Sequence, residues 1–544
     1  MTPQPRHPPG RRLFLAGAAA SPFATARAAT VLSGPETPLR IEPVPMNVTG
    51  RPRMGVGING GVPAPILRWR EGETVSVPVT NRLDVPTSLH WHGLRVPLAM
   101  DGVPGFGFRP IAPGETFTYR FPLRQAGTYW YHSHSGFQEQ SGLYGAIVVD
   151  PAAGYRQTFA RDYVVLLSDW TDETPEAVLA NLKTRGDYYN RDPRTAAAFI
   201  ADARRMGLSA AIADRAAWGA MRMSPHDLLD VTAATYTYLM NGHPPGAGWT
   251  ALFRPGERIR LRLINASAMT IFDLRLPGLP MTVVQADGND IQPVAIDEIR
   301  LGPGETYDVL VRPGADRAYA IFAQALDRGG YALGCLAPRA GMTPDIPPMD
   351  PRPRRTMADM GMNHGGMAMD HGAPPPGAPA LGVSVDNVAA MPMDRTAEPG
   401  TGLENNGRRV LTYSQLRAIR PGADRRPPSR DIVLHLTGNM DRYIWGFDGK
   451  AFSASEPIPL QRDERVRFVL INDTMMEHPI HLHGLWSEVE NGAAAERPFK
   501  HTILVKPAER LSFLVTADEP GRWAFHCHFM FHMDLGMFRE VRVS

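Results

Sequence analysis

The segment RDERVRFVLINDTMMEHPIHLHG, residues 462–484, decides the fold because its pattern occurs three times in the chain. The other copies are EGETVSVPVTNRLDVPTSLHWHG, residues 71–93, and PGERIRLRLINASAMTIFDLRLPG, residues 255–278. In each copy a glutamate is followed by alternating apolar and polar residues, which predicts a β-strand. Eight residues after that glutamate stands an asparagine, at Asn81, Asn265 and Asn472. Repetition of one pattern predicts three related domains.

A second pattern also occurs three times, at residues 113–134, 303–324 and 507–528, and again alternates after a turn signal. Several short strands per repeat, with 52 glycines and 52 prolines in 544 residues, favour turns and strands over helices. We therefore predict an all-β fold of three Greek-key β-sandwich domains. Their expected ranges are residues 40–155, 156–345 and 405–544.

Two segments interrupt the repeats. Residues 175–230, within the second domain, have helix-like composition in PEAVLANLKTR and RTAAAFIADARRMGLSAAIADRAAW, so we predict a helical insertion there. Residues 346–404 are rich in Met, Pro and Gly and show no periodicity, which predicts a long, mobile linker before the third domain.

The N-terminus resembles an export signal. Twin arginines, Arg11 and Arg12, precede a short apolar run that ends in the A-x-A-like site 26–28, so residues 1–28 are predicted to be a Tat signal peptide. We expect a periplasmic protein without stable membrane insertion, because this run is too short to span a bilayer. The formal net charge of +2, without long runs of like charge, gives no indication of nucleic-acid binding.

Histidines provide the main functional signal. Ten of the 17 fall in four groups: His90 and His92; His132 and His134; His478, His481 and His483; His526, His528 and His532. Residues two apart on a strand face the same side, so each H-x-H pair presents two imidazoles together. The second domain has Leu274, Leu276, Phe322 and Gln324 at the matching positions. One pair could be core histidines bonded to backbone carbonyls, but four groups restricted to two repeats indicate metal ligands.

The residue types favour copper. Cys527 stands between His526 and His528, and a thiolate with imidazoles and a thioether describes a blue-copper site. Zinc is the alternative metal, but a single cysteine with a methionine is a poor zinc ligand set. The other cysteine, Cys335, is interpreted as a small buried residue without function.

The motifs HWHG, HSH, HPIHLHG and HCHFMFHMDLGM resemble the four copper-binding motifs of the multicopper oxidase family, and the resemblance covers the whole mature chain. It implies cupredoxin-like domains and four copper ions. The implied type 1 ligands are His478, Cys527, His532 and Met537. The implied type 2 ligands are His90 and His481, and the implied type 3 ligands are His92, His132, His134, His483, His526 and His528. The trinuclear cluster would then lie between the first and third domains.

The resemblance also implies a reaction, in which a reducing substrate delivers single electrons to the type 1 copper and O2 accepts four of them to form water. Cys527 would transmit these electrons, since its side chain points away from those of its two histidine neighbours. Asp101 resembles the family's proton-relaying acid, although it could equally be a turn residue before Gly102. Related cuprous oxidases can have a glutamate where this chain has Met533, so the second proton donor stays open, with Asp534 a weak candidate.

Thioethers suggest Cu(I) as the reducing substrate, because soft ligands suit this ion. The candidate docking residues are Met475 and Met476, beside His478, and Met357, Met360, Met362, Met367 and Met369, in the linker with His364 and His371. The ending HMDLGMFREV is similar to that of periplasmic copper-resistance oxidases, which implies a role in copper tolerance. A laccase acting on phenols is the alternative enzyme, and a copper-sequestering protein is the alternative without turnover. We expect a monomer.

Overall fold

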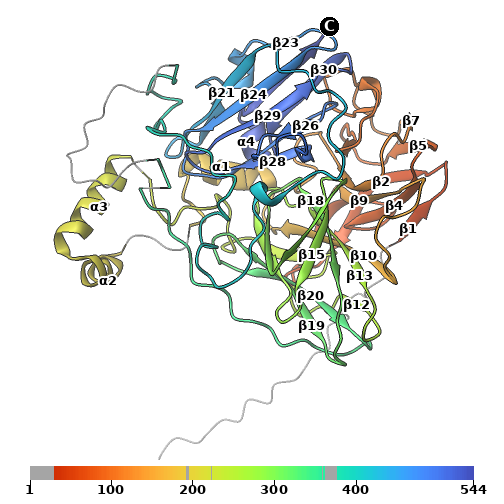
Figure 1. The fold of residues 1–544 in the computed structure, drawn as a ribbon, viewed down its shortest axis with the longest axis horizontal. Helices are drawn as coiled ribbons and strands as arrows, with labels where there is room; N and C mark the ends of the chain where they lie inside the picture. The colour runs from red at the N-terminus through yellow and green to blue at the C-terminus, as the bar shows by residue number, and fades with distance from the viewer. Residues whose placement is uncertain (1–29, 191–194, 222, 358, 362–376) are drawn as a thin grey trace, which may run out of the picture.

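The computed structural model describes residues 30–190, 195–221, 223–357, 359–361 and 377–544. Six sheets in this part of the chain pair into three sandwiches, coloured red to orange, yellow to green and blue along the chain in Figure 1. The predicted all-β fold of three sandwiches is confirmed. The predicted signal peptide, residues 1–28, lies outside the described residues.

The first sandwich is formed by two sheets that share one apolar core containing Trp69, Val77 and Tyr119. One sheet has the order β1 (Val31–Ser33), β4 (Ala64–Arg70), β9 (Tyr144–Asp150), β8 (Gly127–His132) and β6 (His90–His92). The other has the order β3 (Arg53–Ile58), β2 (Leu39–Met46), β5 (Thr74–Asn81) and β7 (Thr116–Pro122).

The second sandwich repeats this plan. Its six-stranded sheet has the order β11 (Thr237–Met240), β10 (Arg161–Trp170), β13 (Ile259–Asn265), β18 (Thr306–Val311), β15 (Met281–Ala286) and β16 (Asn289–Ile296). Its five-stranded sheet has the order β12 (Thr250–Leu252), β20 (Tyr331–Ala337), β19 (Tyr319–Ala325), β14 (Phe272–Arg275) and β17 (Glu298–Leu301).

The third sandwich contains the C-terminal strands. Its six-stranded sheet has the order β22 (Ile444–Phe447), β21 (Asp431–Asn439), β24 (Arg465–Asn472), β29 (Arg510–Thr516), β26 (Ser487–Val489) and β27 (Phe499–Lys500). Its five-stranded sheet has the order β23 (Ile458–Leu460), β31 (Phe538–Val543), β30 (Gly521–Cys527), β25 (His478–Leu482) and β28 (Thr502–Val505).

The three sandwiches share their strand pairing. The first repeated strand of each domain runs parallel to an earlier strand, in the pairs β2–β5, β10–β13 and β21–β24. It runs antiparallel to the second repeated strand, in the pairs β5–β7, β13–β18 and β24–β29. Parallel neighbours require crossover connections, which is why the domains have Greek-key rather than meander topology.

The repeated asparagine has the same structural role in every domain. Its side-chain amide donates to two carbonyl groups beyond the strand end: Asn81 to Val85 and Ile111, Asn265 to Thr270 and Leu301, and Asn472 to Met476 and Val505, at 2.7–3.0 Å. These buried bonds fix the loop that leads into the next strand. In the first and third domains that next strand begins with His90 or His478.

The segment between β10 and β11 contains three helices, α1 (Pro175–Thr184), α2 (Ala196–Met206) and α3 (Leu208–Ala220), as predicted for the insertion. Thr174 and Thr195 cap the first two by accepting hydrogen bonds from the amides of Ala177 and Ala198. Figure 1 shows α2 and α3 projecting from the body of the protein. A fourth helix, α4 (Met530–Asp534), follows β30 and contains His532.

The described parts of the linker, residues 346–357, 359–361 and 377–404, contain no helix and no named strand, but ion pairs tie them to the domains. Arg354 binds Asp202 of α2 and Asp214 of α3, at 2.7 and 2.8 Å. The neighbouring Arg355 is buried, and its guanidinium lies 3.4 Å from Glu477. Because a buried arginine needs a partner, this part of the linker is anchored rather than a free tether.

Within the described part of the chain, none of the helices combines the length and the apolar character needed to cross a bilayer.

Candidate metal centre

Eight histidines gather at the seam between the first and third domains, and together they are called the histidine cluster: His90, His92, His132, His134, His481, His483, His526 and His528. Register brings them together, because His90 lies opposite His132 in the β6–β8 pair, and His481 lies opposite His526 in the β25–β30 pair. The structure thus brings these eight residues together at one place.

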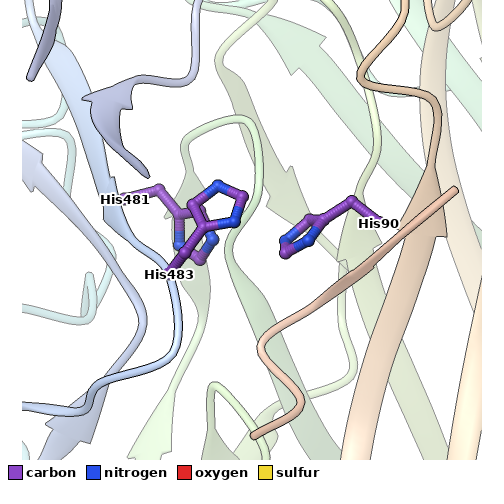
Figure 2. Close-up of side chains that lie close together, drawn as sticks. All are labelled: His90, His481 and His483. Atoms are coloured by element: carbon purple, nitrogen blue, oxygen red, sulfur yellow. The ribbon is translucent and has the colours of Figure 1, made fainter. Parts of the chain in front are cut away.

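The rings from the two domains interleave across the seam. The rings of His92 and His481 are stacked with their centroids 3.8 Å apart, and those of His90 and His483 are 4.0 Å apart. Figure 2 shows His481 and His483, from the third domain, facing His90, from the first. All eight are buried except His134, which is partly exposed. Burying so many imidazoles against one another is unfavourable unless a ligand satisfies their nitrogens.

The ring nitrogens test whether metal ions fit here. In six of the eight histidines at least one buried nitrogen has no hydrogen-bond partner: His90 Nε2, His92 Nδ1, His132 Nε2, His134 Nε2, His481 Nε2 and both nitrogens of His528. In the other two, His483 and His526, the Nε2 atoms lie 3.0 Å from each other. Unpartnered imidazole nitrogens that converge from two domains are the donor set of a multinuclear copper or zinc site.

Burial also sets the protonation state of this cluster. It lowers the pKa of His92, His132 and His481 far below the ordinary value, and neighbouring imidazoles lower it further. It lowers the pKa of His526 to about 3. These rings are therefore neutral at pH 7, and the neutral imidazole is the form that binds metal ions.

Two buried carboxyl groups orient rings of the cluster. Asp101 Oδ2 accepts a hydrogen bond from His483 Nδ1 at 2.9 Å. The main-chain carbonyl of Asp101 accepts one from His90 Nδ1 at 2.9 Å, and its Oδ1 lies 3.2 Å from the same nitrogen. Glu139 Oε2 lies 2.6 Å from His132 Nδ1, and burial raises the pKa of the Glu139 carboxyl well above its usual value. Such contacts fix which nitrogen of each ring is free for a metal. The sequence motifs pointed to Asp101 but not to Glu139.

The second candidate site, the Cys527 set, consists of Cys527, His478, His532 and Met537. Cys527 Sγ lies 3.5 Å from His478 Nδ1 and 3.9 Å from His532 Nδ1, and these two nitrogens are 3.4 Å apart. The backbone of Met537 bonds to Cys527 and His532, and its side chain is buried. Burial raises the pKa of the Cys527 thiol, so a metal ion is needed to hold the thiolate.

The outer edge of His532 is covered. Its Nε2 donates to Asp230 Oδ2 at 2.7 Å, and the Tyr443 hydroxyl donates to the same oxygen at 2.8 Å. Trp445 stacks on the ring with centroids 3.8 Å apart. Asp230 belongs to the segment that follows α3, so the insertion and the third domain close over this ligand together. No sequence pattern predicted Asp230, because 302 residues separate it from His532.

We expect Asp230→Asn to raise the reduction potential of the Cys527 set, because it removes a negative charge beside His532 while keeping a hydrogen-bonding side chain. The measurement is a redox titration of the blue absorption band at about 600 nm. Asp227→Asn is the matched control, since Asp227 is a buried acid three residues away. An unchanged or lowered potential in Asp230→Asn would contradict this role for the carboxylate.

The other predicted residues lie in different surroundings. Met475 and Met476 are fully buried, Met357 and Met360 are nearly so, and Met362, Met367, Met369, His364 and His371 lie outside the described residues. The docking of Cu(I) at these methionines therefore stays a prediction. Asp534 lies on the exposed side of α4, away from the buried surface of that helix. Cys335 and Cys527 are both buried and free.

Comparison with known proteins identifies the family. Three family profiles, each described as multicopper oxidase, match residues 40–154, 161–338 and 425–544. The chain belongs to the multicopper oxidase family. It is therefore an oxidoreductase of this copper-dependent family, and the chemistry and free nitrogens of the two residue sets fit copper.

Two relatives extend this result. The chain is 51% identical to a copper resistance protein A homolog of Pseudomonas syringae pv. tomato, over 94% of this chain and 93% of the relative. It is 48% identical to copper resistance protein A of Escherichia coli, over 95% and 94%. Among solved structures, the multicopper oxidase Fet3p has a TM-score of 0.67 at 18% identity, covering 94% of this chain and 91% of that one, which supports the fold alone.

Proposed function

We propose that this multicopper oxidase oxidises Cu(I) and reduces O2 to water, and that it contributes to copper tolerance in the periplasm. The observation that carries the oxidase assignment is the tripeptide His526–Cys527–His528 of β30. Its cysteine belongs to the Cys527 set, whereas its two histidines belong to the histidine cluster. One short covalent path therefore joins a site suited to electron entry with a site suited to oxygen.

We assign the ligands as the motifs predicted. The type 1 copper is held by His478, Cys527, His532 and Met537; the type 2 copper by His90 and His481; and the type 3 pair by the remaining six histidines of the cluster. Bound there, four copper ions supply one-electron acceptance from the donor and four-electron delivery to O2. The chain keeps these rings neutral, orients them through their second nitrogens, and excludes water by burial.

Oxygen reduction also consumes protons, and two acids lie in direct contact with the cluster. Asp101 accepts from His483 Nδ1, so it can pass a proton at Oδ2. Glu139 is the second candidate, because its raised pKa favours a proton on the unpartnered Oε1 while Oε2 contacts His132. Glu139 thereby offers the second acid that Met533 does not.

The covering of His532 favours a small donor over a bulky one. Its ring has no exposed surface, because Asp230, Tyr443 and Trp445 surround it. A phenol cannot place its ring against this ligand without displacing those side chains, so direct contact between a bulky donor and His532 is blocked. The similarity to copper resistance proteins supports a role in copper tolerance. A phenol-oxidising laccase is the second candidate. A protein that only stores copper would not need one tripeptide that joins the two sites.

The test is oxygen uptake by the copper-loaded enzyme with Cu(I) and with 2,6-dimethoxyphenol side by side. We expect about four Cu(I) ions consumed per O2, and a kcat/KM at least about tenfold higher for Cu(I). Replacing Met362, Met367 and Met369 together by leucine should raise KM for Cu(I) about fivefold or more, because it removes soft ligands. Phenol kinetics and the blue band should not change.

The matched control for this variant replaces two exposed methionines outside the linker, Met54 and Met206, by leucine. It should leave both substrates unaffected. An equal decrease in kcat/KM for Cu(I) and for the phenol, or the same decrease in the control, would contradict a docking role for the linker methionines. Oxygen uptake with the phenol but none with Cu(I) would show that the protein is a phenol-oxidising laccase and not a cuprous oxidase.

A further inference from the structure

A turn of the second domain reaches the seam where the histidine cluster lies. β15 and β16 are joined by Asp287 and Gly288, whose φ angles of 45° and 76° are typical of a tight two-residue hairpin turn. A Cβ atom on Gly288 would lie 2.2 Å from the hydroxyl oxygen of Tyr129, in the first domain. Only glycine fits at this position, so the turn is packed directly against the first domain.

The carboxylate of Asp287 extends from this turn into the third domain. Its Oδ2 accepts hydrogen bonds from the amides of His501 and Thr502, both at 3.1 Å, and its Oδ1 accepts one from the amide of Thr306 at 3.0 Å. Lys500 Nζ lies 3.0 Å from the same Oδ2. Asp287 is fully buried, and these four donors satisfy it.

The two residues held by Asp287 bond to two rings of the cluster. The carbonyl oxygen of His501 accepts a hydrogen bond from His481 Nδ1 at 2.6 Å. The hydroxyl oxygen of Thr502 lies 2.9 Å from His92 Nε2. In both rings the opposite nitrogen, His481 Nε2 or His92 Nδ1, is buried without a partner. These contacts therefore determine which nitrogen of each ring is free to bind metal.

We propose that Asp287 is a positioning residue for the trinuclear site: through the backbone of residues 501–502 it orients His481 and His92. The second domain, which has no ligand histidines at the matching positions, thereby sets the geometry of a centre built by the other two. The inference rests on the proposed copper ligands. It assigns no contact between Asp287 and the metal ions, substrate or oxygen.

The surrounding charges keep Asp287 in its ionised form. Burial opposes ionisation, but His501, Lys500 and the backbone donors outweigh it and lower the pKa of the carboxyl below its usual value. Lys500 is itself fully buried and also pairs with Glu305 at 3.0 Å. A fixed negative charge that accepts several hydrogen bonds resists displacement, so the 501–502 backbone is held in one place.

Four variants distinguish a positioning role of Asp287 from a role in stability alone. Asp287→Asn keeps the turn, because asparagine also favours positive φ, but its single acceptor oxygen cannot serve the Thr306 amide together with the His501 and Thr502 amides. Thr502→Val is the second variant, since valine has the shape of threonine without the hydroxyl. Thr502→Ser restores the hydroxyl. Asp327→Asn is the control, because Asp327 is a buried acid in another turn of the same domain.

The experiment measures copper bound per chain, the type 2 signal by electron paramagnetic resonance, the blue band and the Tm of the metal-free protein. We expect Asp287→Asn and Thr502→Val to bind cluster copper about tenfold more weakly in competition with a chelator. Their type 2 signal should shift or be lost, and the blue band should remain. Thr502→Ser and Asp327→Asn should match the wild type.

Cluster copper retained at wild-type affinity in both Asp287→Asn and Thr502→Val, with an unchanged type 2 signal, would overturn the inference. If Asp287→Asn does not fold, the Thr502→Val and Thr502→Ser pair decides, since only the hydroxyl differs in function. These measurements need no turnover. A wild type that binds copper in the cluster but does not oxidise Cu(I) would therefore refute the proposed function and leave this inference standing.

Discussion

Cys527→Ser should abolish the blue band and lower oxygen uptake with Cu(I) by at least about 10³-fold. The serine oxygen is a harder and less polarisable donor than the thiolate, so the set of His478, His532 and Met537 loses the ligand that selects and tunes copper. Cys527 is also the residue that joins the two sites, through its peptide bonds to His526 and His528. The measurements are the absorption at about 600 nm and the rate of oxygen consumption.

The matched control is Cys335→Ser, because Cys335 is the other buried free cysteine and lies in the second domain. It should preserve both the blue band and the uptake of oxygen. Copper binding by the histidine cluster should persist in Cys527→Ser, since none of the eight imidazoles is changed. Oxygen uptake at the wild-type rate in Cys527→Ser would show that electrons enter elsewhere and would refute the mechanism.

The three repeats could be predicted from sequence because they have local causes. Alternation of apolar residues specifies a strand within a few residues, and the asparagine at the strand end bonds to carbonyls of the loop it fixes. The same locality explains why the cluster was predicted as a set. Two histidines separated by one residue must share a face of a strand, and equivalent strands of two domains face the same seam.

The residues that surround the ligands could not be predicted in this way. Asp230 and Asp287 each approach the centre from the second domain, across 302 residues to His532 and 214 residues to His501. Neither stands in a motif, and a buried acid has no periodic signal. Glu139 is nearer in sequence, seven residues after His132, but its contact depends on the loop that follows β8. Packing between domains creates these contacts, so sequence patterns within one domain do not contain them.

The structure revises the role that the sequence suggested for the second domain. It carries Leu274 and Phe322 where the other domains carry ligand histidines, which suggested architecture without chemistry. In the structure it supplies Asp230 at one site and Asp287 at the other, both buried and both bonded toward candidate ligands. Its contribution is therefore electrostatic and positional. A domain without ligands can still control a metal site when its acids fix the rings that bind the metal.

Asp101→Asn should lower kcat with Cu(I) by about 10² or more while leaving the blue band unchanged. Asp101 lies between the first and third domains. Among the described residues, it is the only acid with carboxylate oxygens close to both His90 and His483: Oδ1 lies 3.2 Å from His90 Nδ1, and Oδ2 lies 2.9 Å from His483 Nδ1. Asparagine keeps one acceptor oxygen for His483 Nδ1–H but places an NH2 group beside His90 Nδ1, and it cannot take up a proton. Both orientation of the ring and supply of protons to oxygen would therefore be impaired.

Single-turnover kinetics separate this defect from slow electron entry. Cu(I) added without oxygen should bleach the blue band of Asp101→Asn at the wild-type rate, because the Cys527 set is unchanged. Readmitting oxygen should restore the band about a hundredfold more slowly than in the wild type, since that step consumes protons at the cluster. Asp84→Asn is the control, as Asp84 is an exposed acid of the same domain. Slow bleaching, or recovery at the wild-type rate, would show that Asp101 is a turn residue before Gly102 and no more.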